Sequence, residues 1–437
     1  MATNPSQAKA RTRSGIALVC AAASVVAVAC SSGGDTGEEA PTSGAISAGG
    51  ENLSGEPIKF GFLNGITGAY AQFAPAAING AEVAVKDINA GGGVNGRPVE
   101  LILQDNKSTP EGAVSGYNKL VDADRVLAIG GIDSDAVQAL LKPTSEQHMP
   151  TICSFCGTTA LDKAGGDYMW RLAPSDSDIG IATAQYARDA GLMRMSGMAQ
   201  KTEGSLSGLN SFAEVYTGPV GGEMINEVQF DSTKSTFQSE VQQATEGDPD
   251  AIYLSMGPSE ALSMLREWQR RGADGNFIMS MDLTVPEVAE FDFLSDGRAV
   301  GLAPGYDKTT PSYEHFAKRL MEEKNTEPHE GLGEPNYYDT FIVLALAATA
   351  AGDDVTSEAI NASIPAVVNE PGTVCYVYTE CADLLKAGEE IDYQGASGTL
   401  QLNEFGNLDS PLMTVIAVRD GAWVAEKTLE LDPSLRK

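Results

Sequence analysis

The sequence has few of the residues that metal centres and phosphate-binding surfaces require. Its 437 residues include three histidines and six cysteines, which leaves little material for an elaborate metal site. Basic residues are also scarce, because 29 lysines and arginines stand against 60 aspartates and glutamates, a formal net charge of −31. A surface this acidic repels phosphate, so we expect no nucleic acid partner.

Recognisable catalytic motifs are missing as well. The sequence contains no GxSxG, no HExxH and no Walker loop. The three glycines at residues 91–93 follow a predicted helix rather than a strand, so they do not form a phosphate cradle. We therefore expect no enzyme activity and no cofactor. An acid–base pair of carboxylates stays open, since acids are numerous and no pattern selects two of them.

A long apolar run is absent, and the longest candidate lies near the N-terminus. Basic residues precede apolar residues 16–29, a run shorter than the roughly 20 residues of a membrane-spanning helix and typical of a signal peptide. Residues 27–34 (AVACSSGG) resemble a bacterial lipobox, in which the cysteine, here Cys30, carries the lipid after cleavage. An ordinary signal peptide is the alternative. We predict a lipoprotein signal peptide over residues 1–29.

The following residues lack large apolar side chains. Residues 31–56 consist mostly of glycine, serine, threonine, alanine, proline and acid, so burial cannot offset their ordering entropy. We predict a flexible tether over residues 30–56. The protein is then expected to be exported and lipid-anchored to the outer face of the cell membrane.

The remaining body alternates between strand and helix patterns. The hydrophobic fraction of 42% allows a sizeable core. Predicted strands cover residues 58–63, 99–103, 126–129, 149–153, 193–199, 223–230, 251–255 and 276–280. Predicted helices cover residues 75–90, 111–121, 178–190, 206–216, 237–244, 260–271, 311–324 and 337–351, and later strands cover residues 399–402, 412–418 and 423–427. This alternation predicts an α/β fold with parallel sheets covered by helices, and the length predicts two lobes.

Four cysteines remain in this body. Cys153 and Cys156 form a CxxC, and Cys375 and Cys381 lie close together in the sequence. In an exported chain disulfides are favoured, and of the three possible pairings we favour 153–156 with 375–381. A secreted thiol–disulfide oxidoreductase using the CxxC is an alternative. A metal site adding His148 is another, but it lacks a fourth ligand.

The order of several motifs carries a family resemblance. The motifs are residues 61–68 (GFLNGITG), 79–82 (NGAE), 89–98 (NAGGGVNGRP), 105–106 (DN), 129–131 (IGG), 170–176 (WRLAPSD) and 393–398 (YQGASG). In this order the chain resembles the type I periplasmic solute-binding proteins, in the Leu/Ile/Val-binding branch that serves ABC importers. The resemblance implies two Rossmann-like lobes joined by three crossovers, with the ligand between them. It places lobe 1 at residues 57–174 with 303–397, and lobe 2 at residues 175–302 with 398–437.

The resemblance also implies ligand contacts. The family binds an amino acid carboxylate with a serine and with a loop after the next strand, which match Ser134 and the positions of Cys156, Gly157 and Thr158. Several N–H and O–H donors suit a carboxylate. A helix N-cap is the alternative role for Ser134.

The opposite end of the ligand is expected at other residues. The family's acid for the ligand ammonium matches Asp282, for which a helix cap is the alternative role. An aromatic residue that lines the family's pocket matches Phe73, for which core packing is the alternative role. Two further aromatic positions are Glu203 or Gly204, and Gly257, so we expect a wider pocket to which Glu203 adds charge.

These departures leave the ligand open. Asp133 beside Ser134 would also weaken anion binding unless it points away. Besides an amino acid, the candidates are an amide, a urea-like compound, a polyamine or a larger acid. The expected partners are this small molecule and the membrane permease of an ABC importer, with a sensor that has no transport role as the alternative.

Overall fold

The computed structural model describes residues 43–47, 50, 53–231, 233–234, 236–272, 275–329, 331–408 and 412–436. The predicted signal peptide and Cys30 lie outside these residues. Among the helices described, none combines the length and the apolar character needed to cross a bilayer. Residues 40–437 belong to one compact unit.

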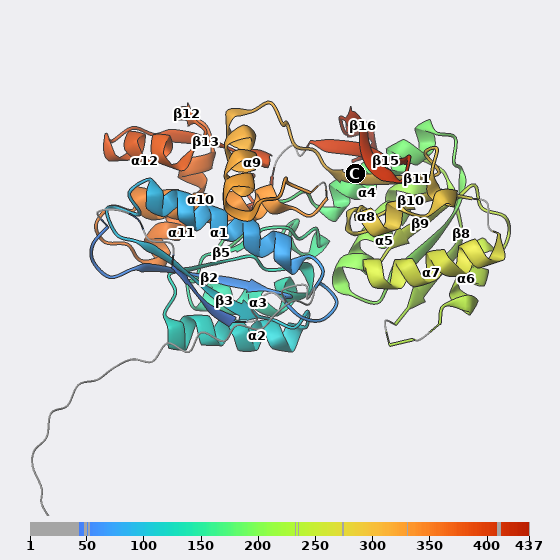
Figure 1. Cartoon of the computed structure of the whole chain (residues 1–437), viewed down its shortest axis with the longest axis horizontal. Helices are drawn as coiled ribbons and strands as arrows, with labels where there is room; N and C mark the ends of the chain where they lie inside the picture. Colours follow the sequence, from blue (N-terminus) through green and yellow to red (C-terminus); the bar gives the residue numbers. More distant parts are fainter. Residues whose placement is uncertain are drawn as a thin grey trace, which may run out of the picture. The chain divides into compact units, whose positions relative to one another are not determined.

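Strands and helices alternate along most of the chain (Figure 1). The strands are β1 (Ser43–Ser47), β2 (Ile58–Asn64), β3 (Val99–Asp105), β4 (Ala128–Gly130), β5 (Thr151–Cys153), β6 (Met169–Arg171), β7 (Arg194–Gln200), β8 (Glu223–Phe230), β9 (Ala251–Ser255), β10 (Asn276–Met279), β11 (Ala299–Pro304), β12 (Thr373–Cys375), β13 (Ile391–Gly395), β14 (Gly398–Thr399), β15 (Met413–Arg419) and β16 (Ala422–Leu429). The helices are α1 (Ala74–Ala90), α2 (Pro110–Asn118), α3 (Ser134–Glu146), α4 (Asp176–Asp189), α5 (Glu203–Thr217), α6 (Gln238–Thr245), α7 (Pro258–Arg271), α8 (Pro286–Ala289), α9 (Pro311–Lys324), α10 (Glu334–Ala350), α11 (Ser357–Val368) and α12 (Tyr378–Lys386). Short helical turns are η1 (Lys119–Asp124), η2 (Thr159–Leu161), η3 (Met281–Leu283), η4 (Asp292–Leu294) and η5 (Pro433–Leu435).

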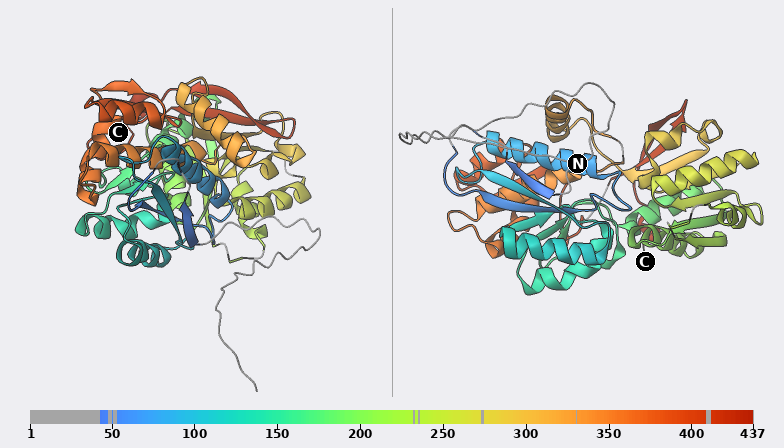
Figure 2. Two further views of the ribbon diagram at one scale, coloured as in Figure 1. Left: turned by 60° about the vertical axis from the view of Figure 1, so that its left-hand side comes forward. Right: turned by 60° about the horizontal axis from the view of Figure 1, so that its bottom comes forward.

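The first sheet has the strand order β1-β3-β2-β4-β5-β6 and is parallel except for β1. Alternate side chains of its strands enter two hydrophobic clusters, one with α1 and α10 and one with α2 and α3. Figure 2 shows these helices on opposite faces of the sheet. Helix α10 is buried along almost its whole length, which confirms the core helix predicted at residues 337–351.

The second sheet has the order β16-β15-β11-β10-β9-β7-β8. Its five strands from β7 to β11 are parallel, whereas β15 pairs antiparallel with both β11 and β16. Helices α4 and α5 pack on one face, and α6, α7 and α8 pack on the other. The α/β class with parallel-dominated sheets is therefore confirmed. A small third sheet has the order β12-β13-β14.

Two regions differ from the prediction. Ser43–Ser47, inside the predicted tether, forms β1 and pairs with the edge of β3, so the prediction of a tether without regular structure is wrong for these residues. The residues after 398 also stay with the first sheet, because Leu400 and Leu402 are buried in its core. The last passage to the second sheet therefore comes after residue 408 rather than at residue 398.

Helix caps place polar side chains where strands of the two sheets end. Asp133, Ser175 and Thr202 each accept a hydrogen bond from a backbone N–H in the first turn of the helix that follows them, namely α3, α4 and α5. Each cap follows a strand within a few residues. Because the carboxyl ends of parallel strands share one edge of a sheet, these helix starts gather polar groups there.

The cysteines of the body are paired in the structure. Cys153 is bonded to Cys156 and Cys375 to Cys381, the pairing favoured from the sequence. All four side chains are buried. The first disulfide closes the loop after β5, and the second joins β12 to α12.

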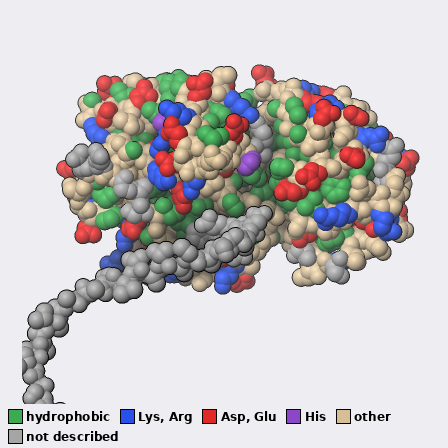
Figure 3. All heavy atoms as spheres, viewed as in Figure 1, with side chains coloured by type: hydrophobic (Ala, Val, Ile, Leu, Met, Phe, Trp, Pro, Cys, Tyr) green, Lys and Arg blue, Asp and Glu red, His purple; other side chains and the backbone are tan. Residues whose placement is uncertain are grey.

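Charge is also spread over the surface. On the face shown in Figure 3, acidic and basic side chains are interspersed. The excess negative charge of the protein is therefore not confined to the acids at the strand ends.

Candidate functional site

The predicted ligand residues follow strands of both sheets. Ser134 follows β4, the loop with Cys156, Gly157 and Thr158 follows β5, Glu203 follows β7, and Asp282 follows β10. Hydrogen bonds and charge interactions, given below, connect these groups across the two sheets. Phe73 lies before α1 and is considered separately.

Glu203 bridges the two sheets rather than standing free. Its backbone N–H donates to Asp135 Oδ1 at 2.7 Å, and its Oε1 accepts from Thr158 Oγ1 at 2.9 Å and from Gln138 Nε2 at 3.1 Å. Asp135 and Gln138 belong to α3, and Glu203 begins α5. Oε1 of Glu203 is therefore held by protein donors of the first sheet, and the charge that Glu203 adds to the pocket stays a prediction.

Ser134 is the first residue of α3 and is buried. The helix cap is its neighbour Asp133, whose Oδ1 accepts from Ala136 N at 3.1 Å, so the alternative role for Ser134 as the N-cap is wrong. The Ser134 hydroxyl forms no hydrogen bond with any described residue and stays available. Asp133 Oδ2 is held by Asn106 Nδ2 at 2.6 Å, so this carboxylate has partners of its own.

The loop after β5 offers two backbone donors. The N–H groups of Gly157 and Thr158 bond to no residue in the described part of the chain, whereas both carbonyls are occupied. A side chain at Gly157 would lie 2.0 Å from Asp176 Oδ1, so only glycine lets the loop approach α4 this closely. Cys156 is buried and contributes through the disulfide to the shape of this loop.

Two acids that follow the strands have carboxylate oxygens without partners, although Ser207 and the charge of Arg171 stabilise Asp176 in part. Asp282, in η3, makes no hydrogen bond or ion pair with a described residue. Asp176, the first residue of α4, is buried, and its Oδ2 also has no partner in the described part of the chain. Burial and the nearby charge of Asp176 raise the pKa of Asp282 to about 7, and burial raises the pKa of Asp176 to about 6. An unpaired buried carboxylate is costly, which is why both pKa values rise.

Two tyrosines, the half-buried Tyr70 and the buried Tyr337, connect these acids with those of the first sheet. Burial, then Asp135, Asp133 and Asp282, raise the pKa of Tyr70. Burial, Asp133 and Asp282 also raise the pKa of Tyr337. Asp282 therefore lies within electrostatic reach of both tyrosines and belongs to the same polar cluster as Ser134.

Phe73 is one layer away from this cluster. It is the half-buried residue before α1, and its ring centroid lies 6.4 Å from that of Tyr70. Tyr70 is the ring whose pKa responds to the acids.

The sequence pointed to Phe73 but not to Tyr70, three residues earlier, and it did not point to Asp176. Asp176 is the last residue of the motif at residues 170–176. Its position shortly after a strand is the signal that could have identified it.

The two glycines at family aromatic positions lie beside polar side chains. A Cβ at Gly204 would lie 3.2 Å from the Tyr70 hydroxyl and 3.5 Å from Ser134. At Gly257 it would lie 3.1 Å from Glu260 and 3.4 Å from Gln200. Gly204 therefore faces Tyr70 and Ser134 of the first sheet, and the wider pocket stays a prediction. At Gly257 the surroundings are polar.

A metal site is not indicated by the residues described. They contain no group of three or more histidine, cysteine, aspartate or glutamate side chains arranged to hold an ion. Cys153 and Cys156 of the alternative site are bonded to each other.

The raised pKa values predict opposite pH dependences for stability and binding. An unfolded aspartate has a pKa of about 3.9, so between about pH 4 and pH 7 the folded state binds more protons and its stability falls as pH rises. The contribution is complete below about pH 4 and is lost through the folded pKa values of about 6 for Asp176 and about 7 for Asp282. We expect the unliganded protein to melt higher at about pH 5.5 than at about pH 7.5, while an amine-bearing solute binds more weakly at the lower pH.

The Asp282→Asn variant is the control for this measurement. It removes one of the two groups, so the pH dependence of its melting temperature should be smaller than that of the wild type. An equal dependence in both proteins would show that Asp282 keeps an ordinary pKa.

Known proteins are similar to this chain in sequence. Residues 57–407 match the family described as periplasmic binding protein. The substrate-binding protein BasB of the chemotactic signal transduction system of Halobacterium salinarum is 25% identical over 362 residues, covering 80% of this chain and 84% of that protein. The Leu/Ile/Val-binding protein of Escherichia coli is 30% identical over 131 residues, 30% of this chain and 36% of that protein.

Solved structures agree with this match in fold. The leucine binding protein LivK from Thermotoga maritima has a TM-score of 0.72 at 23% identity, covering 85% of this chain and 99% of its own. A solute binding protein of an ABC transporter from R. palustris, in complex with benzoate, has a TM-score of 0.73 at 19% identity, covering 87% of this chain and 99% of its own. The chain belongs to the periplasmic binding protein family, whose model it matches over residues 57–407, and its fold is that of the solved structures named above.

Proposed function

We propose that this protein is the extracytoplasmic substrate-binding lipoprotein of an ABC importer. Its ligand is a small solute with an amine at one end and a carboxylate or amide at the other. Family membership supports solute binding, and the printed names of relatives include amino acid-binding proteins. Cys30 is the proposed site of the lipid, and the importer's permease is the proposed partner.

The observation that carries this proposal is the pair of acids that have carboxylate oxygens without partners. The half-buried Asp282 has no hydrogen bond or ion pair with a described residue, and the buried Oδ2 of Asp176 has no hydrogen-bond donor among them. An ammonium group would supply both the opposite charge and the missing hydrogen bonds. Burial without such a group raises the pKa of each acid, so the unliganded site is electrostatically unfavourable.

Donors of the first sheet suit the other end of the ligand. The Ser134 hydroxyl and the amides of Gly157 and Thr158 have no partner among the described residues. Three donors aimed at one group bind a carboxylate or an amide oxygen. Because acids come from one sheet and donors from the other, a ligand that contacts both favours the closed arrangement over an open one.

A second candidate is a solute receptor for chemotaxis. The relative BasB is named as the substrate-binding protein of a chemotactic signal transduction system and matches most of this chain. The same site would bind the same class of solute, and only the membrane partner would differ. The CxxC alternative has less support, because both sulfur atoms are buried and paired.

A thermal-shift screen of amino acids, amides, ureas, polyamines and carboxylates tests the ligand class. A ligand at 100 times its dissociation constant stabilises by about 2.7 kcal/mol, which gives a clear shift. We expect shifts from compounds with a primary amine, and shifts only from compounds without an amine would contradict the proposal. Loss of uptake of the same solute after gene deletion indicates an importer, whereas loss of chemotaxis with normal uptake indicates the sensor.

A further inference from the structure

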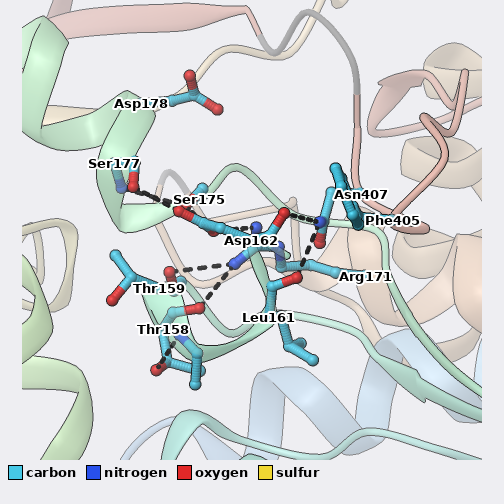
Figure 4. Close-up of polar contacts among 12 residues, drawn as sticks. Thr158, Thr159, Leu161, Asp162, Arg171, Ser175, Ser177, Asp178, Phe405 and Asn407 are labelled. Carbon is cyan, nitrogen blue, oxygen red and sulfur yellow. Dashed lines mark hydrogen bonds and ion pairs between the residues drawn. The ribbon is translucent and has the colours of Figure 1, made fainter. Parts of the chain in front are cut away.

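Arg171 is a fully buried cation at the end of β6. Its side chain is 1% exposed, and its Nη1 donates to the carbonyl oxygens of Gly157 at 3.2 Å and Thr158 at 2.9 Å. Figure 4 shows the guanidinium between this loop and the segment that leads to α4. We use the name donor loop for residues 154–159. Arg171 thus holds the donor loop by its backbone.

Binding the carbonyls orients the amides. In a planar trans peptide the C=O and N–H of one unit point in opposite directions, so Arg171 turns the Thr158 N–H away from itself. The next amide, Thr159 N, donates to Ser207 Oγ at 3.2 Å in α5. The Gly157 carbonyl also accepts from Asp176 N at 2.7 Å. The direction of the Thr158 N–H, one of the two amides proposed for the ligand, is therefore set from behind the loop.

The other side of the guanidinium holds the connection between the sheets. Nη2 donates to Asp162 Oδ1 at 2.7 Å, and Asp162 also accepts from Ser175 Oγ at 2.6 Å and Ser177 Oγ at 2.5 Å. We use the name crossover segment for residues 172–177, where the chain leaves the first sheet and begins α4. One acid therefore joins Arg171 to the part of the crossover segment where α4 begins.

A second segment that leads to the second sheet, at residues 406–407, also lies beside Arg171. The Arg171 backbone N–H donates to Gly406 O at 2.9 Å, and Asn407 Nδ2 donates to Leu161 O at 3.0 Å (Figure 4). The chain passes to the second sheet shortly after these residues. A cavity of about 500 Å³ adjoins this junction and is lined by Arg171, Asp162 and Ser177 as well as by α5. Free volume of this kind leaves room for the junction to move.

We propose that Arg171 is a positioning residue that couples the crossover segment to the donor loop, so that movement of one sheet against the other changes the direction of the loop amides. A guanidinium suits this role because its fork donates in two directions at once, toward the loop carbonyls and toward Asp162. A lysine carries one compact ammonium on a flexible stem and cannot hold both sides in the same geometry. The description of the loop as ligand-binding rests on the proposed function, whereas the coupling rests on the contacts alone.

Hydrogen exchange measured by mass spectrometry on the protein without added solute tests the coupling. In Arg171→Lys we expect exchange to become roughly tenfold faster in peptides from both the donor loop and the crossover segment, with the strands of the second sheet unchanged. The matched control is Arg188→Lys in α4, which alters an arginine paired on the surface with Asp189 and Asp432 and should leave both segments unchanged.

A second variant keeps the test decisive if Arg171→Lys does not fold. Asp162→Asn preserves size and removes the charge that Arg171, Ser175 and Ser177 share, so exchange should increase in both segments. Faster exchange in the crossover segment with an unchanged donor loop would overturn the coupling. A uniform increase across both sheets would also overturn it, because it would show that Arg171 only stabilises the fold. Since no solute is added, these results do not depend on whether the proposed function is correct.

Discussion

Asp282→Asn is expected to lower the affinity for an amine-bearing solute by about 100-fold, because a buried charged hydrogen-bonding partner is worth 2 kcal/mol or more. Asp176→Asn should have a similar effect, since its buried Oδ2 has no partner in the described part of the chain. Ser134→Ala should cost less, about tenfold, because it removes one neutral donor while the loop amides remain. Isothermal titration with a solute from the screen measures all three.

The stability of the unliganded protein should change in the opposite direction. Asp282 is an acid whose pKa is raised by burial and by Asp176, so its replacement by a neutral amide removes an unfavourable charge. We expect the melting temperature of Asp282→Asn without solute to equal or exceed that of the wild type near neutral pH. Weaker binding with undiminished stability would identify a residue kept for function rather than for folding.

The control for these variants is Asp189→Asn. Asp189 ends the helix that Asp176 begins, and its carboxylate is paired with Arg188 at the surface. It should change neither affinity nor stability measurably, because exposed ion pairs contribute little. If Asp282→Asn and Asp176→Asn bind an amine-bearing solute as tightly as this control, the site lies elsewhere.

Asp339→Ala is expected to destabilise the first sheet and its helices by about 3 kcal/mol or more. Asp339 lies on α10, is fully buried, and accepts four hydrogen bonds from β13 and the residues that follow it. The donors are the Tyr393 hydroxyl at 2.7 Å, Ala396 N at 2.9 Å, and Ser397 N at 2.7 Å and Oγ at 2.5 Å. Removing the carboxylate leaves all four donors unpaired in the core.

Urea unfolding followed by circular dichroism measures this effect. Asp383→Ala is the control, because Asp383 is an exposed aspartate of α12 that pairs with Lys386 at 3.5 Å. Asp339→Asn should fall between the two, since an amide accepts at one oxygen only. Equal midpoints for Asp339→Ala and the control would show that water or a shift of the segment after β13 satisfies the donors.

Local sequence patterns predicted the elements that depend on near neighbours. The apolar run at residues 337–351 predicted a core helix, and α10 is buried at nearly every position. The strands predicted at residues 412–418 and 423–427 correspond to β15 and β16, and the turn between them has positive φ at Asp420 and Gly421. Asp282 was selected through the family resemblance, and it follows the strand predicted at residues 276–280. The predictions of these elements depend on the spacing of apolar and turn residues over short stretches, which can be read directly from the sequence.

Contacts between distant residues decided the character of the site. Oε1 of Glu203 is held by Gln138 and Thr158, and its backbone N–H donates to Asp135, which is 68 positions away. Gly204 faces Tyr70 and Ser134, neighbours that the sequence alone does not identify. The partnerless oxygen of Asp176 likewise became visible only once its neighbours were placed.

The sequence by itself thus determined the α/β class, the family, the pairing of nearby cysteines and the strand ends that bear polar residues. Periodicity, spacing and motif order are local properties that survive without coordinates. The tertiary structure alone decided which carboxylate oxygens remain without partners and which ring lies near them. It also decided how Arg171 joins the donor loop to the crossover segment. The physical reason is that a charge is free or paired only relative to groups brought to it by folding.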